Sequence, residues 1–257
     1  MQQANLFQTL LTLGISLTIL CFILTARGGR QLFIRRIPGL SAVDEAVGRA
    51  TEMGRPILFS ISLGGIDVDT LLALSVGQHV ARLAARYGTR MILPVVEPSV
   101  FPVAQEICRE AWAAEGKIEA YRPDDIRFLS GQQFAYAAGV MGLINREQCA
   151  SIFYFGYFYA EALLLAENGQ EVGAIQVAGT PATTQIPFFL VSCDYTVIGD
   201  EYYAASAYLS REPTLLGSLV GQDIGKLVLG AVVLVGACLS LWYGTTQHLL
   251  TQWARGW

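Results

Sequence analysis

Apart from Arg255, the charged residues of this 257-residue chain lie between Arg27 and Lys226, and the stretches on either side are apolar. Residues 1–26 contain no charged side chain, and neither do residues 227–254. Each stretch is longer than the ~20 residues that an α-helix needs to cross the hydrocarbon core of a bilayer. We therefore predict two transmembrane helices, over residues 6–26 and 227–244.

Each of these predictions has an alternative. The first stretch could be a cleaved signal peptide, but no Lys or Arg precedes it and its apolar run is too long for one. The second could be a buried core helix. Its length, its glycines and the Trp242–Tyr243 pair at its end favour the membrane, because aromatic rings collect at the bilayer interface.

The positive charges beside the two stretches predict their orientation. Four arginines follow the first stretch: Arg27, Arg30, Arg35 and Arg36. Lys226 precedes the second, and only Arg255 lies on the other side. Because Lys and Arg are enriched on the cytoplasmic side, we expect a cell-membrane protein with both termini outside and a cytoplasmic central domain. The predicted parts are the N-terminal helix and basic stem (1–36), the central domain (37–222) and the C-terminal helix and tail (223–257).

The overall charge excludes several classes of protein. Charged residues make up 15% of the chain, against about 25% in ordinary soluble domains. Residues 37–222 carry 11 basic and 20 acidic side chains, so the central domain has no basic surface for DNA or RNA. We expect the lipid bilayer as a partner and no nucleic acid.

Histidines and cysteines do not form a recognisable site. There are two histidines and five cysteines, and no two cysteines have the C-x-x-C spacing. Neither a zinc site nor a disulfide framework is indicated. We expect no metal, no cofactor, and cysteines that are buried, inert thiols.

In the central region, short apolar runs alternate with longer helical stretches. The predicted strands are residues 56–62, 90–96, 117–121, 149–155, 172–178 and 188–192. The predicted helices are residues 41–53, 67–87, 100–115, 130–145, 159–168 and 199–210. Continuous apolar strands alternating with helices are typical of a parallel sheet covered on both faces. We predict an α/β fold, a Rossmann-like three-layer domain with a mostly parallel sheet.

Helix ends and uncharged stretches add detail. Ser41 is expected to cap its helix, and Gly88, Gly116 and Gly169 to end theirs. Residues 128–145, 148–160 and 172–193 are uncharged and could be further membrane spans. Their glutamines, glycines and prolines, and the shortness of the apolar runs, favour packing in the domain instead.

Polar residues after the strands are the candidate ligand site, because ligands of open α/β sheets lie beyond the carboxyl ends of the strands. The candidates are Ser62, Gly64, Gly65, Asp67 and Asp69 after the first strand, Glu97 after the second and Asp194 after the last. The alternative is a tight Gly-Gly turn with acidic helix caps and solvated loop charges. No nucleotide-binding or catalytic motif is present, so we name no catalytic residue.

An aromatic segment follows the fourth predicted strand. Six of the seven residues 153–159 are Phe or Tyr, the exception being Gly156, and Glu161 lies two residues beyond Tyr159. Aromatic side chains are enriched at interfaces and in ligand pockets. Packing in the core is the other interpretation of this segment.

Small residues recur every four positions toward the C-terminus. They are Gly217, Gly221 and Gly225, and then Gly236, Ser240 and Gly244. This spacing permits close helix packing in and near a bilayer, although chance could also produce it in a chain with 26 glycines. Neither predicted span contains an ionisable residue, which favours anchors over a transport path.

Residues 56–112, from PILFSISLGG to QEICREAW, resemble an uncharacterised family of bacterial and archaeal membrane proteins. The resemblance implies a hydrophobic N-terminal helix, a central α/β domain and a second apolar helix. It implies no site residues.

Two functions remain open. The first is a membrane-anchored scaffold, more a structural protein than an enzyme, whose domain self-associates or docks partners as a homo-oligomer or a subunit of a larger membrane complex. The second is a membrane-tethered enzyme or sensor that binds a small ligand, such as a nucleotide, near Asp67, Glu97 and Asp194. Replacing Asp67 and Asp69 by Asn should separate the two.

Overall fold

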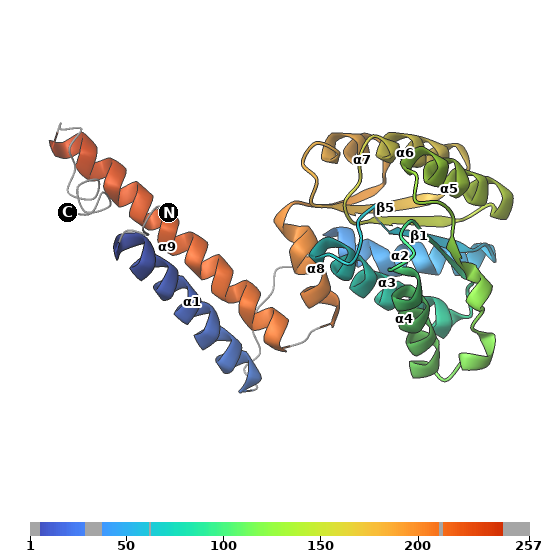
Figure 1. The fold of residues 1–257 in the computed structure, drawn as a ribbon, viewed down its shortest axis with the longest axis horizontal. Coiled ribbons are helices and arrows are strands. Elements are labelled where there is room, and N and C mark those ends of the chain that lie inside the picture. Colours follow the sequence, from blue (N-terminus) through green and yellow to red (C-terminus); the bar gives the residue numbers. More distant parts are fainter. Residues whose placement is uncertain (1–5, 29–37, 62, 211–212, 244–257) are drawn as a thin grey trace. The chain divides into compact units, whose positions relative to one another are not determined.

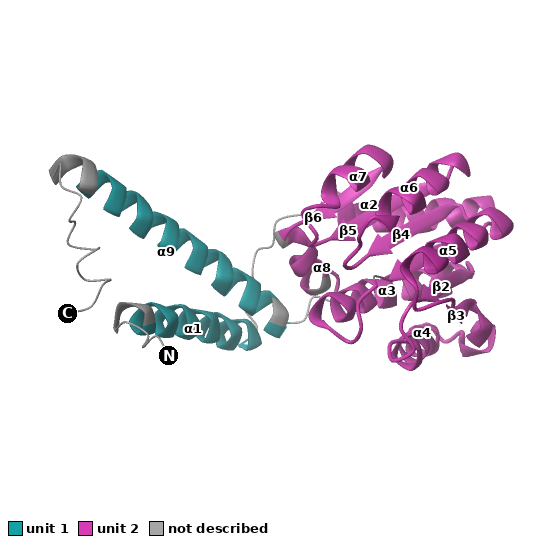
Figure 2. Cartoon of the chain, turned by 45° about the horizontal axis from the view of Figure 1, so that its top comes forward, with its two compact units in different colours: residues 1–34, 211–257 teal, residues 35–210 magenta. Residues whose placement is uncertain are grey.

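A computed structural model describes residues 6–28, 38–61, 63–210 and 213–243 of the chain (Figure 1). The chain divides into two compact units. One is formed by residues 35–210, and the other by residues 1–34 together with residues 211–257 (Figure 2).

The larger unit is built on a parallel sheet. Its strands are β1 (Ile57–Ile61), β2 (Met91–Val95), β3 (Ile126–Phe128), β4 (Ser151–Phe155), β5 (Ile175–Thr180) and β6 (Tyr195–Ile198). They lie in the order β3-β2-β1-β4-β5-β6, and every neighbouring pair is parallel. The predicted α/β class with a parallel sheet is confirmed.

Helices cover both faces of this sheet (Figure 1). One face packs against α2 (Pro38–Met53), α3 (Val68–Tyr87), α4 (Phe101–Ala114) and α8 (Asp200–Ser210). The other packs against α5 (Gln133–Glu147), α6 (Glu161–Glu171) and α7 (Ile186–Ser192). Two short 3₁₀ turns, η1 (Ile118–Ala120) and η2 (Pro123–Asp125), precede β3.

The central strands are apolar throughout because both of their faces are buried. In β1, Phe59 packs in the core beneath α3, while Leu58 packs in the core beneath α5. The Phe59 ring stacks on the rings of Phe153 and Phe155 in β4, with centroid distances of 6.0 and 5.7 Å. Such strands show no polar alternation, which is why their sequences read as continuous apolar runs.

Two of the predicted strands are wrong. Residues 117–121 form an exposed turn around η1, and β3 is Ile126–Phe128 instead. Residues 188–192 belong to α7, which begins beside Pro187 and leaves Val191 on its outer face, 82% exposed. Proline is tolerated in the first turn of a helix, where its missing N–H has no partner to lose. The last strand, β6, follows this helix.

Helix ends match the predictions in part. Gly88 ends α3 in the left-handed conformation, with φ of 74°, and Gly116 follows α4 with φ of 69°. Ser41 is not a cap, because α2 already begins at Pro38. Gly169 lies inside α6 and has no room for a side chain, since a Cβ atom there would overlap the side chain of Gln176.

The smaller unit is a pair of helices, α1 (Leu6–Arg27) and α9 (Pro213–Tyr243). Within the described residues these are the two helices long and apolar enough to cross a membrane, over Thr9–Arg27 with mean hydropathy 2.2 and Leu216–Leu239 with mean hydropathy 1.7. The second helix begins before residue 227, where we expected the span to start. It therefore includes Asp223 and Lys226, and the expectation of a helix without ionisable residues is wrong.

Candidate functional site

The candidate ligand site lies where the chain changes direction in the sheet. Strand β1 is flanked by β2 on one side and by β4 on the other. The chain leaves β1 toward α3 on one face of the sheet and leaves β4 toward α6 on the other face. In open α/β sheets, ligands bind in a crevice outside the carboxyl ends of two such strands. Here a main-chain hydrogen bond of 3.4 Å, from the Leu63 N–H to the Tyr157 carbonyl, crosses from the loop after β1 to the loop after β4.

Asp67 has a local structural role at this edge of the sheet. It is the N-cap of α3, and its Oδ1 atom accepts a 2.7 Å hydrogen bond from the Thr70 N–H. Gly64 leaves room for that arrangement, because a Cβ atom there would stand 2.5 Å from Asp67 Oδ2. The carboxylate is therefore directed at its own helix, as in the alternative that we gave for the Gly64–Gly65 turn.

Asp69 lies in the first turn of α3, where α8 packs. Its carbonyl oxygen accepts a 2.6 Å hydrogen bond from the Tyr202 hydroxyl. The pKa of its carboxyl group is raised, first by burial and then by the nearby Asp67 charge, while a hydrogen bond from Tyr203 opposes the rise. The Asp67 charge therefore disfavours ionisation of Asp69, as like charges do.

The other predicted ligands do not gather around Asp67 and Asp69. Glu97 follows β2 at the same edge, and its carbonyl oxygen accepts a hydrogen bond from the Val100 N–H. Ser62 lies outside the described residues. Asp194 lies at the opposite edge, because it precedes β6 instead of following a strand. Its Oδ2 atom accepts a 2.8 Å hydrogen bond from the N–H of Gln176, near the start of β5.

A buried carboxylate that we had not assigned to the site lies at the crevice edge. Glu161 begins α6 and is fully buried. Its Oε1 atom accepts a 3.0 Å hydrogen bond from the Tyr159 N–H, and its Oε2 atom accepts one from the Gln133 amide of α5. Buried carboxylates are rare unless paired or hydrogen-bonded. The sequence signal was a glutamate directly after the aromatic segment.

The aromatic segment is divided between core and surface. Phe153, Tyr154, Phe155 and Phe158 are buried. Tyr157 and Tyr159 are exposed, and their rings meet edge to face with a centroid distance of 5.2 Å. The core interpretation therefore holds for the four buried residues, whereas a role of the two exposed tyrosines in an interface or a ligand pocket stays a prediction.

Exposed apolar side chains gather at this carboxyl edge. They belong to the loops after β1 and β4, the end of β6 and the first turns of α3, α5 and α8. We call this set the apolar edge: Ile66, Val68, Phe134, Tyr157, Tyr159, Ile198 and Tyr203. Exposed apolar patches on folded domains mark sites of interaction with proteins or membranes, or ligand-binding grooves.

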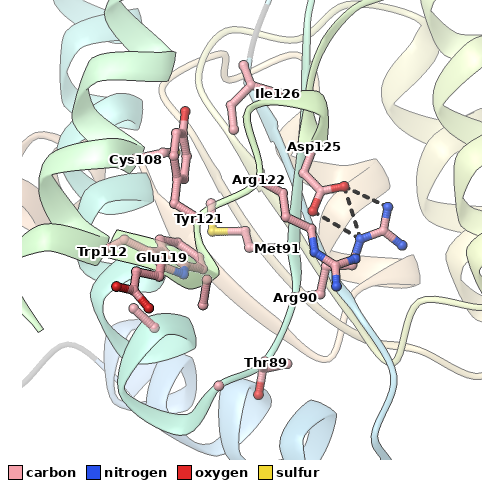
Figure 3. A pocket seen from close by; sticks show the side chains of 13 residues that line it. Thr89, Arg90, Met91, Cys108, Trp112, Glu119, Tyr121, Arg122, Asp125 and Ile126 are labelled. Atoms are coloured by element: carbon pink, nitrogen blue, oxygen red, sulfur yellow. Dashed lines mark hydrogen bonds and ion pairs between the residues drawn. The ribbon is translucent and has the colours of Figure 1, made fainter. Parts of the chain in front are cut away.

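The opposite edge of the sheet holds a cavity of about 260 Å³ between α3, α4 and the start of β2 (Figure 3). Trp112 and Tyr121 line it, with a centroid distance of 6.2 Å. Arg90 also lines it, but its guanidinium is engaged by Asp125 at 2.6 Å and by Glu147 at 2.7 Å. This ion-pair network connects β2 to the ends of η2 and α5.

Metal binding and thiol chemistry find little support in the described ranges. Among those residues, no group of three or more His, Cys, Asp or Glu side chains is arranged to hold a metal ion. All five cysteines are free. Burial raises the thiol pKa of Cys108 and of Cys149 to about 12, and a thiol that stays protonated is a poor nucleophile.

The predicted small-residue stripe faces α1 over part of its length. A Cβ atom at Gly217 would stand 2.7 Å from the Ile23 Cα atom, and one at Gly221 would stand 2.8 Å from the Ile19 Cα atom. At Gly225 the nearest atom is Ile15 Cγ2 at 3.6 Å. Gly236 is half-buried, whereas the Ser240 side chain and Gly244 lie outside what the structure describes.

These features define a class of protein: an α/β domain with a parallel sheet, joined at both ends to long apolar helices that pack against each other. Residues 1–250 match the model of a protein family described as a domain of unknown function, DUF6754. The chain belongs to this family. Comparison with curated proteins gives no match, and comparison with solved structures gives none.

Proposed function

We propose that this protein is a membrane-anchored scaffold. Helices α1 and α9 would hold it in the bilayer as a two-span anchor, and its α/β domain would bind further copies of the chain or other subunits of a membrane complex. The observation that carries the proposal is the apolar edge, where the sheet presents exposed Ile, Val, Phe and Tyr side chains in place of a converging set of polar ligands.

The anchor is supported by composition and packing. Both helices are apolar over about the thickness of a bilayer, and only 6% of each apolar window is buried inside the protein. The four arginines that follow the apolar stretch of α1, Arg27, Arg30, Arg35 and Arg36, favour a cytoplasmic domain with both termini outside. On this proposal the exposed leucines of α1 meet lipid.

Interaction through the apolar edge is supported by what surrounds it. Asp67 is engaged in capping α3, and Asp194 lies at the other edge of the sheet. The side chains left exposed at the crevice are largely aromatic or branched, which are the types enriched in the centre of protein interfaces.

The test is native mass spectrometry of the full chain in mild detergent, with Val68→Glu as the edge variant. Val68 is 67% exposed in the first turn of α3, where an acidic side chain is compatible with the helix. Val191→Glu on α7 is the matched control. Val191 is exposed, but it lies near the C-terminal end of α7, next to the start of β6 and away from the apolar edge. We expect a defined oligomer or complex that Val68→Glu weakens and Val191→Glu does not. A wild-type monomer without partners would overturn the proposal.

A second candidate function is a membrane-tethered enzyme or sensor for a small ligand. It is supported by the strand order, which is that of Rossmann-like dinucleotide-binding domains, and by the buried Glu161 beside the crevice. The likeness of order is an analogy of fold and does not by itself assign an activity. A stoichiometric extra mass in the same spectra would favour this candidate.

A further inference from the structure

The contacts between α1 and α9 give the relative level of every residue in the two helices. Gly217, Gly221 and Gly225 are spaced by four residues along α9, and they meet Ile23, Ile19 and Ile15, which are spaced by four in the reverse direction along α1. Beyond this series, the Arg27 Nε atom donates a 3.4 Å hydrogen bond to Thr214 Oγ1. The two helices are therefore antiparallel in a fixed register.

This register places two charged residues at the middle of α1. Asp223 lies midway between Gly221 and Gly225, and so at the level of Leu17, which lies midway between Ile15 and Ile19. Lys226 lies one residue beyond Gly225, at the level of Gly14. Because α1 extends from Leu6 to Arg27, both levels are close to its centre. If α1 spans the bilayer, these charges lie deep in the hydrocarbon.

The charged side chains point away from α1. A helix turns by about 100° per residue, which puts Gln222, Lys226 and Asp223 between about 100° and 200° from Gly221 around α9. All three side chains are exposed. We call these residues the polar stripe. Polar side chains at this depth normally face the interior of a helix bundle, but α1 does not cover this stripe.

We infer that the polar stripe is a contact with a second copy of this chain inside the membrane, in which Asp223 of one copy faces Lys226 of the other. The inference rests on the proposed membrane anchoring and names the partner of the anchor. One acid and one base, spaced by three residues on the same face, make the stripe complementary to itself. In a symmetric pair of copies, Asp223 of each chain faces Lys226 of the other, so the contact occurs twice, as a two-fold interface requires.

Two other arrangements are outcomes of the test. Asp223 and Lys226 could pair within one helix, since residues three apart are neighbours on its surface. Alternatively, the helix pair could shift so that the charges reach the bilayer interface. That shift would leave the apolar residues 17–26 of α1 outside the hydrocarbon, which makes it the less favourable arrangement.

The experiment is charge complementation between two differently tagged full-length chains expressed together in membranes. Asp223→Lys gives a stripe with two bases, and Lys226→Asp gives one with two acids. When the two tagged copies carry the same variant, we expect several-fold less of one copy to copurify with the other than for wild type. When one copy carries Asp223→Lys and the other carries Lys226→Asp, we expect copurification to be restored. Pairing within one helix predicts no such rescue, and would overturn the inference.

Cysteine cross-linking keeps the inference testable if the charge variants fail to insert. In a chain with Cys21→Ser and Cys238→Ser, Gln222→Cys should form disulfides between copies in membranes, while Leu17→Cys, at the same depth on α1, should not. Equal cross-linking at the two positions would overturn the inference. Release of the wild-type chain from membranes by alkaline carbonate would overturn the proposed anchoring as well, whereas retention without complementation would overturn only the contact.

Discussion

Gly221 on α9 lies so close to Ile19 on α1 that a Cβ atom at the glycine would stand 2.8 Å from the Ile19 Cα atom. The same relationship holds at Gly217 and is looser at Gly225. Close main-chain approach of this kind is what small residues spaced by four provide in membrane helices. The two apolar helices are thus a packed pair with a defined register.

Gly221→Ala should destabilise this pair, although alanine favours helices. Its Cβ atom would force the helices apart, and overpacking of this kind costs about 1–3 kcal/mol. Gly230→Ala is the matched control on the same helix, because nothing lies within 4 Å of a Cβ atom there. The control should gain about 0.5–1 kcal/mol from helix propensity. We expect thermal midpoints in detergent to shift in opposite directions, and an unchanged midpoint for Gly221→Ala would contradict the packing.

The fold could be predicted from sequence where a strand is buried on both faces. Strands β1, β2, β4 and β5 appear as apolar runs, and Gly88 marks the end of α3. The edge strands could not be predicted in this way. Strand β3 has three residues, one of them Arg127, so its extended structure depends on pairing with β2 instead of on its own composition.

The candidate site was less predictable because it depends on which edge each loop reaches. We predicted a strand over residues 188–192, which would place Asp194 at the same edge of the sheet as Asp67. These residues instead form helix α7, which returns the chain to the opposite edge before Asp194. The burial of Glu161 depends on Gln133, which is distant in sequence. From hydropathy we predicted that the second span starts after Lys226, whereas the main chain is already helical from Pro213.

Arg90→Gln should destabilise the α/β domain. The guanidinium of Arg90 donates to both oxygens of the buried Asp125 and to Glu147, and these partners raise its pKa. Removing one partner of a buried pair costs about 3–5 kcal/mol. Here we expect about 2 kcal/mol, since Arg90 is one-third exposed and Arg127 remains 3.7 Å from Asp125.

Arg109→Gln is the control for this measurement. Arg109 pairs with Glu106 on the exposed face of α4, where solvent screens the pair, so its loss should change the free energy of unfolding little. Chemical denaturation of the two variants in detergent compares them directly. Equal losses would mean that the network around Arg90 is no more than a surface ion pair.

His79 should make the domain less stable below neutral pH. Burial lowers its pKa, and Arg82 and Arg86 add to this, while Asp44, with its Oδ1 atom 4.0 Å from Nε2, opposes it. The unfolded chain then binds more protons than the folded one between the lowered pKa and about 6.5, so stability falls as pH falls through that window. His79→Gln should flatten the change in thermal midpoint between about pH 7 and 5.5. A variant with the wild-type slope would assign the pH dependence to other groups.

Glu161 distinguishes a structural carboxylate from a ligand-binding one. Glu161→Ala removes the acceptor of the Tyr159 N–H and of the Gln133 amide. A buried donor left unpaired costs about 1–3 kcal/mol, and these two partly buried donors should cost less than that each. Glu161→Gln retains the first acceptor, and the second bond can be restored by rotating the Gln133 amide, which exchanges its oxygen and nitrogen. On the scaffold proposal, Glu161→Gln should therefore unfold close to wild type in denaturant and retain the native oligomer mass, whereas Glu161→Ala should be less stable. If the carboxylate charge binds a small ligand, Glu161→Gln should instead lose a copurifying mass while remaining folded, and that result would favour the second candidate function.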